Sequence, residues 1–209
     1  MHKPLSTGAT IGILGGGQLG RMLSVAAARL GFRSHIFEPG VACPASHVAD
    51  QLTTASYTDT DALQRFAETV DVITYEFENI PTSALDVLEQ VATIRPGREA
   101  LRISQDRLTE KDFLNSLGLK TAPYAAIDDA PALGAALNAF STAAILKTRR
   151  FGYDGKGQVR LQPDSDPQAA VADLAGQAAL LEGFVDFSHE VSVIGARGAD
   201  GAVCCFDPG

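Results

Sequence analysis

The stretch TIGILGGGQLG, residues 10–20, decides the fold of this chain. It begins with a short apolar run of the kind that forms a buried strand, and three consecutive glycines stop that run. Apolar residues then recur at helical spacing, at Leu19, Met22, Leu23, Ala26, Ala27 and Leu30. The order of strand, glycine turn and helix predicts the first two elements of a βαβ unit.

Strands and helices continue to alternate downstream. Residues 34–37 are predicted to form a second strand, with Glu38 at its carboxyl end. A helix with one apolar face then leads into an apolar strand at residues 72–75, and Pro81 opens the next helix. This alternation predicts a Rossmann-like α/β domain with a parallel sheet and helices on both of its faces.

The pattern breaks at Ile94-Arg95-Pro96-Gly97, which we take as a domain boundary. We therefore expect a Rossmann-like substrate domain at residues 1–97 and a second domain, of α+β type, at residues 98–209. Its expected elements are a helix containing Phe113, Leu114 and Leu117, strands at 145–147, 158–161, 179–182, 190–194 and 202–206, and a helix at 169–174.

Composition and charge limit the classes of function. The 209 residues are 45% hydrophobic, which is enough for one large core or two smaller ones. The 25 acidic residues outnumber the 17 basic ones, and the net charge of −8 would repel a nucleic acid backbone. Nucleic acid is therefore not an expected partner, although small anions can still bind local backbone N–H groups and single cations.

The cysteines and histidines suggest no metal site. Cys43, Cys204 and Cys205 lack C-x-x-C spacing, and the four histidines are scattered, so we name no metal ligand and expect no disulfide framework. The N-terminus lacks the apolar core of a signal peptide, and no stretch approaches the ~20 apolar residues of a membrane span. We expect a cytoplasmic protein.

Residues 15–20 fit the pattern G-x-G-x-x-G between a strand and a helix, where an anionic ligand could approach the helix N-terminus. Because Glu38 could bind ribose hydroxyls, one alternative is an NAD or FAD site and a nicotinamide-dependent oxidoreductase. A second alternative is that the glycines serve only tight packing of the helix on the sheet.

Two acids follow the predicted strand at 72–75, in the segment YEFEN. In open α/β sheets, ligands bind outside the carboxyl ends of the strands. Glu76, directly after the strand, is better placed than Glu78 to meet a ligand amine or hydroxyl. The alternative is a solvated loop that merely carries charge.

The segment KTRRFGYDGKGQ, residues 147–158, is the most informative stretch. Lys147 ends a strand, and the three glycines of the following loop let it approach and close over a triphosphate whose oxygens Lys147 would bind. The alternative is a cationic hairpin in which the glycines only turn the chain.

The run LLEGFV, residues 180–185, resembles a hinge strand whose backbone edge could bind an adenine, with Glu190 downstream for ribose hydroxyls. His189 could suggest a metal ligand or an acid–base group, but an isolated surface histidine explains it better.

Five motifs in order resemble the N5-carboxyaminoimidazole ribonucleotide synthetase family of the ATP-grasp superfamily: GGGQLGRM from Gly15, YEFENIP from Tyr75, QDRLTEK from Gln105, GYDGKGQ from Gly152 and HEVSVIGAR from His189. Formate-dependent glycinamide ribonucleotide formyltransferase shares this architecture. The intact GYDGKGQ and QDRLTEK segments favour the carboxylating family.

The resemblance implies that ATP phosphorylates bicarbonate to carboxyphosphate, and that the exocyclic amine of 5-aminoimidazole ribonucleotide then captures the carboxyl group. Matching positions imply that ATP contacts Arg107, Lys147, Gly152, Tyr153, Asp154, Gly155, Lys156, Gly157, Gln158, Glu182, Gly183, Phe184, Val185 and Glu190. The residues facing the ribonucleotide would be Gln18, Leu19, Glu76 and Tyr153, and those acting on the transferred groups Asp154 and Lys156.

The chain departs from the family at Gly209, where it stops inside the expected ATP-grasp domain. The family's later region supplies the ligands of Mg²⁺ and the grip on the ribonucleotide phosphate, so we expect the chain as given to be incomplete for catalysis. The resemblance implies a homodimer for the whole protein. The alternative is a non-catalytic nucleotide-binding module.

Overall fold

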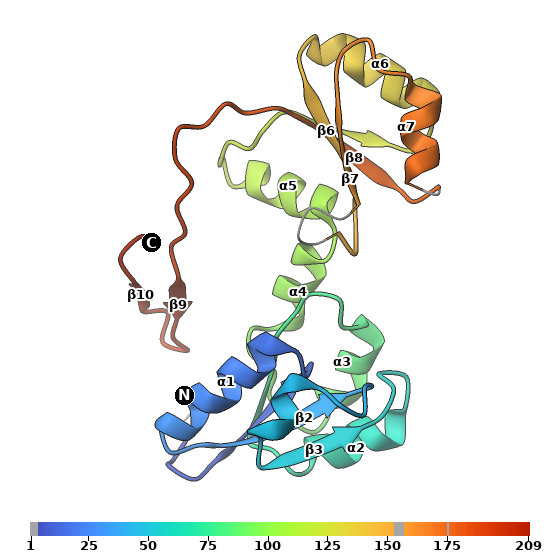
Figure 1. Ribbon diagram of the computed structural model, residues 1–209. Helices are drawn as coiled ribbons and strands as arrows, with labels where there is room; N and C mark the ends of the chain where they lie inside the picture. The colour runs from blue at the N-terminus through green and yellow to red at the C-terminus, as the bar shows by residue number, and fades with distance from the viewer. Residues whose placement is uncertain (1–3, 153–156, 175) are drawn as a thin grey trace.

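The computed structural model describes residues 4–152, 157–174 and 176–209. Figure 1 shows two lobes, each built on a sheet, with two helices between them, α4 (Arg98–Ser104) and α5 (Arg107–Ser116). An extended segment leaves the second lobe and ends in a hairpin.

The N-terminal lobe is a four-stranded parallel sheet in the order β3-β2-β1-β4. Its strands are β1 (Thr10–Leu14), β2 (Arg33–Glu38), β3 (Gln51–Thr54) and β4 (Val72–Tyr75). Its helices are α1 (Gln18–Arg29), α2 (Thr60–Ala67) and α3 (Thr82–Leu88), with the short 3₁₀ helix η1 (Pro44–His47). The expected Rossmann-like lobe is confirmed. The edge strand β3, whose residues are largely exposed, was not predicted.

Alternate residues of this sheet pack against opposite layers. Leu14, Phe37 and Ile73 share a core with α2 and α3, whereas Ile13 and Ile36 pack with residues of η1 on the other face. All strands run parallel, so the carboxyl ends of β1, β2 and β4 meet at one edge of the sheet. The three glycines that follow β1, residues 15–17, therefore lie beside Glu38 at the end of β2 and Glu76 after β4.

One buried polar side chain, His35, is fully partnered within this lobe. Its Nδ1 lies 2.9 Å from Thr69 Oγ1, its Nε2 lies 2.8 Å from Thr53 Oγ1, and its ring packs edge-on against Phe66. Burial lowers the pKa of His35 below its ordinary value of 6.5, because a charged ring would lose hydration.

The stability of this lobe should consequently fall on mild acidification. Below pH 6.5 the unfolded chain binds a proton at His35 that the folded state resists, so stability falls with pH until the lowered folded pKa is reached. This single group limits the slope to at most about 1.4 kcal/mol per pH unit. Urea unfolding between pH 7.5 and 5.5 should show a flatter profile for His35→Gln than for the wild type. Equal profiles would contradict this assignment.

The C-terminal lobe holds an antiparallel sheet in the order β5-β8-β6-β7. Its strands are β5 (Tyr124–Ile127), β6 (Ala144–Thr148), β7 (Gln158–Leu161) and β8 (Ala179–Gly183), and its helices are α6 (Ala130–Phe140) and α7 (Pro167–Asp173). Both helices pack on one face of the sheet, over a core that includes Leu133, Leu146 and Leu181.

Aspartates fix where several helices begin. Asp59, Asp106, Asp129 and Asp166 each accept a backbone N–H from the first turn of α2, α5, α6 and α7 respectively. Helix α5 differs from the others in burying none of its residues: Phe113 and Leu117, expected on its apolar face, are 41% and 60% exposed. The placement of α5 therefore depends on polar contacts.

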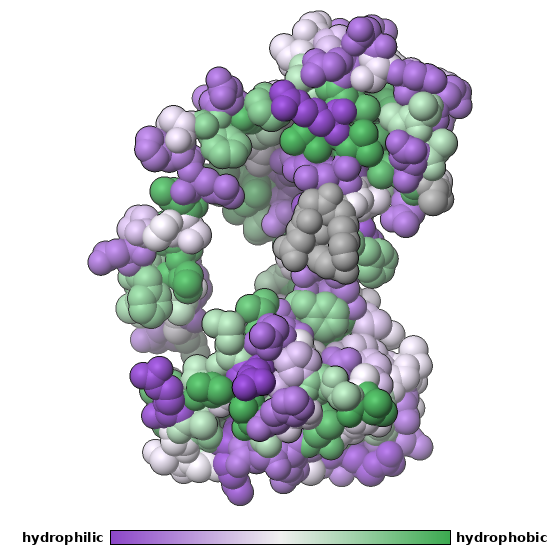
Figure 2. All heavy atoms as spheres, viewed as in Figure 1, coloured by the Kyte–Doolittle hydropathy of each residue, from purple (hydrophilic) through white to green (hydrophobic). Residues whose placement is uncertain are grey.

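The expected strand at residues 190–194 is wrong. Strand β9 comprises Gly195–Arg197 and pairs with β10 (Val203–Cys205), which lies within the expected strand at 202–206. Backbone hydrogen bonds of the earlier stretch join only Ser192 to Gly209 and Ile194 to Phe206, too few for a continuous ladder. Figure 2 shows open space between this segment and the two lobes.

Among the described residues, none of the helices combines the length and the apolarity that crossing a bilayer requires. The domain boundary at residue 97 stays a prediction, with Gly97 forming the N-cap of α4.

Candidate functional site

The second face of the C-terminal sheet is polar. In the register of the sheet, Glu182 on β8 lies opposite Tyr124 on β5 and Ile145 on β6, and Lys147 lies opposite Leu180. Side chains two residues apart on a strand share a face, so Lys147, Glu182 and Tyr124 all project away from α6 and α7. Arg160 on β7, opposite Ile145, shares this face and lies over the ring of Phe184 at 4.4 Å.

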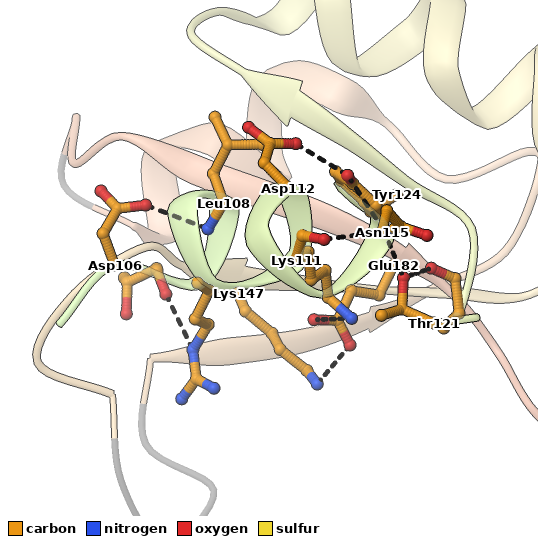
Figure 3. Close-up of polar contacts among 12 residues, drawn as sticks. Asp106, Leu108, Lys111, Asp112, Asn115, Thr121, Tyr124, Lys147 and Glu182 are labelled. Atoms are coloured by element: carbon orange, nitrogen blue, oxygen red, sulfur yellow. Dashed lines mark hydrogen bonds and ion pairs between the residues drawn. The ribbon is translucent and has the colours of Figure 1, made fainter. Parts of the chain in front are cut away.

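A carboxylate held between two ammonium groups forms the centre of this face (Figure 3). Lys147 Nζ lies 2.6 Å from Glu182 Oε2, and Lys111 Nζ, from helix α5, lies 3.3 Å from Glu182 Oε1. The three side chains are 20%, 13% and 14% exposed for Lys147, Glu182 and Lys111. Burial alone would raise the pKa of Glu182, but the hydrogen bond from Lys147 and the charges of both lysines outweigh it and hold the pKa below its ordinary value. Glu182 is therefore ionised, and this cluster of three side chains has two cations for one anion.

The start of α5 is joined to the end of β6. Asp106 accepts from Leu108 and Thr109 N–H groups of α5, and both of its oxygens lie 3.0 Å from Arg149 Nε. Although Asp106 is partly buried, which opposes ionisation, these bonds and the Arg149 charge lower its pKa. Asp106 thus fixes the helix that carries Lys111.

Arg107 reaches the first part of the glycine loop. Its Nε donates to the Thr148 carbonyl at 3.2 Å and its Nη2 to the Gly152 carbonyl at 2.8 Å. A guanidinium in this position holds the end of β6 to the loop that follows. It also lines a small hollow of about 50 Å³ whose other walls include Gly152 and Glu78, from the loop after β4.

The loop itself is described only at its ends. Tyr153, Asp154, Gly155 and Lys156 lie outside the described residues, so their expected roles stay predictions. Gly157 has a φ of +68°, and its carbonyl accepts from Thr148 N at 2.8 Å. A Cβ there would lie 2.6 Å from Thr148 Oγ1, so this position requires glycine. The next residue, Gln158, begins β7 opposite Lys147.

In the predicted hinge, residues 180–185, two backbone N–H groups already donate hydrogen bonds within the protein. Gly183 N donates to Pro123 O at 2.8 Å, and Phe184 N donates to Ala143 O at 2.9 Å. An adenine bound at this edge would therefore have to accept a hydrogen bond from the N–H group of Val185 or of a later residue. Glu190 is exposed in the extended segment that leaves the lobe in Figure 1, so the structure does not bring it to the Lys147–Glu182 pair.

In the N-terminal lobe, acids occupy the helix N-terminus where an anionic ligand was expected. Glu76 accepts from Gly17 N at 2.9 Å and from Gly20 N at 3.1 Å. Glu38 accepts from Gly16 N at 2.8 Å. Both acids line a hollow of about 360 Å³ beside the glycines. Two carboxylates bonded to these N–H groups would repel a pyrophosphate, which disfavours the dinucleotide alternative.

Two further residues predicted to face the substrate lie at the same end of the lobe. Gln18 and Leu19 form the first turn of α1, directly after the glycines, and Leu19 is 56% exposed. The structure thus brings Gln18, Leu19 and Glu76 to one edge of the sheet. Whether they contact a ribonucleotide stays a prediction.

Removing the Glu76 carboxylate should destabilise the N-terminal lobe. In Glu76→Ala two N–H groups of the first turn of α1 lose their acceptor, at a cost of about 1–2 kcal/mol. Urea unfolding followed by circular dichroism measures this loss. Glu68→Ala, at an exposed carboxylate after α2, is the matched control and should change stability by less than about 0.5 kcal/mol. Equal stabilities for the two variants would show that the cap contributes nothing.

Several residues of the site were not identified from the sequence. Gln105 donates to the Ile80 carbonyl at 2.5 Å and accepts from Arg150 at 2.9 Å, so it connects the two lobes. Lys111, Asp106 and Arg149 were also missed as individual residues. The signal that could have found Gln105, Asp106 and Lys111 is the QDRLTEK motif, because these three residues and Arg107 all take part in this network.

Comparisons with known proteins match both lobes. Residues 8–105 match the model of the ribonucleotide synthetase preATP-grasp domain, and residues 112–209 match that of the ATP-grasp domain. N5-carboxyaminoimidazole ribonucleotide synthase of Brucella melitensis is 54% identical over 205 residues, which are 97% of this chain and 57% of the relative. The synthase of Bacillus subtilis is 41% identical, over 95% of this chain and 52% of the relative.

Solved structures agree. An ADP complex of N5-carboxyaminoimidazole ribonucleotide synthetase superposes with a TM-score of 0.92 and 40% identity, covering 100% of this chain and 55% of that chain. The Aspergillus clavatus synthase in complex with ADP and 5-aminoimidazole ribonucleotide gives a TM-score of 0.83 and 25% identity, covering 97% of this chain and 53% of that chain. The chain thus spans about half the length of the relatives that it matches.

Proposed function

Because the chain belongs to the N5-carboxyaminoimidazole ribonucleotide synthase family of ATP-grasp proteins, we propose that it provides the nucleotide-binding face of an ATP-dependent carboxylating ligase. The overall reaction joins bicarbonate to the exocyclic amine of 5-aminoimidazole ribonucleotide, by way of carboxyphosphate, and releases ADP and phosphate. The Aspergillus clavatus relative was solved with ADP and this ribonucleotide, which supports the choice of substrates.

The observation that carries this proposal is the polar face of the C-terminal sheet. Glu182 holds Lys147 in place beside the loop of residues 152–158. From this position the Lys147 ammonium group can exchange its carboxylate partner for phosphate oxygens. Arg107 fixes the base of that loop, so the loop can close over a terminal phosphate without displacing β6. Closure would also exclude water from carboxyphosphate.

The remaining residues are proposed in the roles that the resemblance implies. Asp154 and Lys156 would act at the transferred groups, and Gly152 to Gln158 would contact the phosphates. Glu182 to Val185 would contact the adenine, and Glu190 its ribose. Gln18, Leu19, Glu76 and Tyr153 would face the ribonucleotide.

Magnesium would accompany ATP and neutralise its phosphates. In the part of the chain that the structure describes, no group of three or more His, Cys, Asp or Glu side chains could hold a metal ion. These residues therefore do not fit a complete magnesium site, and we assign no step to the metal. We further propose that the whole protein works in the cytoplasm as a homodimer, with small molecules rather than nucleic acid as its partners.

Calorimetric titration with ATP and with NADH tests the proposal. ATP should bind to the C-terminal lobe. NADH should not bind to the N-terminal lobe, because the carboxylates of Glu38 and Glu76 occupy the N–H groups of Gly16 and Gly17. In a coupled assay of the whole protein, ADP formation should require both bicarbonate and 5-aminoimidazole ribonucleotide. Turnover supported by formate would favour the formyltransferase alternative, ATP binding without turnover the non-catalytic module, and NADH binding without ATP binding an oxidoreductase.

A further inference from the structure

We propose that Lys111 is a positioning residue which keeps Glu182 neutralised while Lys147 moves to the phosphates of ATP. The inference rests on the function proposed above, and it assigns a role to a residue outside the expected set of ATP contacts. Lys111 lies on α5, whereas Lys147 and Glu182 lie on strands β6 and β8 of the sheet.

The geometry separates the roles of the two lysines. Lys147 Nζ contacts Oε2 of Glu182 and Lys111 Nζ contacts Oε1, so each carboxylate oxygen has its own cation. Lys147 lies at the carboxyl end of β6, opposite Gln158, and is the lysine to which the proposed function assigns the phosphate contact. Lys111 is anchored on the opposite side of the carboxylate, where it can stay in place.

Surrounding groups restrict the movement of Lys111. Its ammonium group lies 5.7 Å from the centre of the Tyr124 ring, which favours a cation. That ring is itself held, because its hydroxyl donates to Asp112 Oδ1 at 2.7 Å and accepts from Asn115 at 3.3 Å. The Asp106 cap and its pairing with Arg149 fix the beginning of the same helix.

ATP binding changes the charge balance around Glu182. When the Lys147 ammonium group moves to a phosphate, Glu182 loses its shorter ion pair in a largely buried position that disfavours an unpaired carboxylate. Among the described residues, the titratable and charged groups on its side of the sheet are Lys111 from α5, Lys147 from β6, Tyr124 from β5 and, farther away on β7, Arg160. With Lys111 present, the carboxylate stays ionised. Without Lys111, it must either retain Lys147 or take up a proton.

The test compares Lys111→Met with Lys111→Arg, and uses Lys120→Met, at an exposed lysine beyond α5, as the matched control. ATP and adenosine are titrated calorimetrically in two buffers of different ionisation enthalpy. In Lys111→Met, ATP should bind about tenfold more weakly, because Lys147 can then leave Glu182 only by exposing a carboxylate that has no second cation. Proton uptake should appear on ATP binding, and the affinity should rise as the pH falls. Adenosine affinity should stay within about twofold of the wild type, since adenosine carries no phosphate to attract Lys147.

The controls separate positioning from a purely structural effect. Lys111→Arg should restore tight binding without proton uptake, and Lys120→Met should behave as the wild type. In a Glu182→Gln background there is no carboxylate to neutralise, so adding Lys111→Met should change ATP affinity by less than about twofold. Equal loss of ATP and adenosine binding, or a tenfold loss that persists with Glu182→Gln, would overturn the inference.

Failure of the inference and failure of the proposed function give different results. Unchanged ATP affinity and no proton uptake in Lys111→Met, with normal binding by the wild type, would remove the role of Lys111 alone. No ATP binding by the wild type would overturn the proposed function and this inference with it.

Discussion

Replacing Lys147 with methionine is expected to weaken ATP binding by about 100-fold, the largest effect on binding that we predict. A charged hydrogen bond to phosphate contributes about 1.5–3 kcal/mol, which corresponds to a factor of roughly 10 to 150. The variant also removes the closer partner of Glu182, so the carboxylate keeps only one of its two ion-pair partners, Lys111. Each effect reduces the attraction for a triphosphate.

Calorimetric titration of ATP into Lys147→Met and into the control Lys120→Met measures this effect. The control removes the same charge from an exposed position, so any loss that both variants share reports the long-range field alone. If Lys147→Met bound ATP as tightly as the control, Lys147 would have no direct contact with the phosphates. The proposed nucleotide face would then have to be abandoned.

Replacing Gly20 with alanine should destabilise the N-terminal lobe by about 3 kcal/mol, at the upper end of the cost of overpacking. A Cβ at this position would lie 2.6 Å from the backbone carbonyl oxygen of Gly15, in a turn that cannot move without displacing the glycines bonded to Glu76 and Glu38. Helix α1 would have to shift away from the loop, at the expense of both carboxylate caps.

Gly134→Ala provides a matched control, because Gly134 also lies within a helix. Its added Cβ would make an ordinary contact of 3.5 Å with Pro167 Cγ, and alanine is the better helix former by up to about 1 kcal/mol. Urea unfolding should therefore show opposite signs for the two substitutions. A small effect of Gly20→Ala would mean that the loop relaxes more easily than its packing implies.

The first elements of the N-terminal lobe could be predicted from local patterns in the sequence. The apolar run of β1, the glycines and the helical spacing of α1 are all read within a few residues, so the strand, turn and helix were predicted correctly. The edge strands β3 and β5 were not, because QLTT and YAAI carry little apolar alternation. Their identity comes from pairing with β2 and β8, which are distant in sequence.

In the candidate site, too, the residues predicted from the sequence are those marked by a local pattern, and the residues missed are those brought in by the fold. Lys147 and Glu182 were identified because each stands beside a recognisable segment, the glycine loop and the hinge strand. The partner Lys111 was missed, because only the docking of α5 on the sheet brings it to Glu182. For Glu76, the position after β4 was predicted correctly. Its bonds to Gly17 and Gly20 were not, since a glycine pattern indicates available N–H groups without indicating which acceptor fills them.

Helix α5 buries none of its side chains, and the ion pairs that hold it to the C-terminal lobe are those of Lys111 with Glu182 and of its N-cap Asp106 with Arg149. Attachment of this kind weakens with ionic strength, whereas burial of apolar side chains does not. Added salt should accordingly loosen α5 while the sheet beneath it stays folded. The salt concentration would therefore set how often Lys111 separates from Glu182, whether or not a ligand is bound.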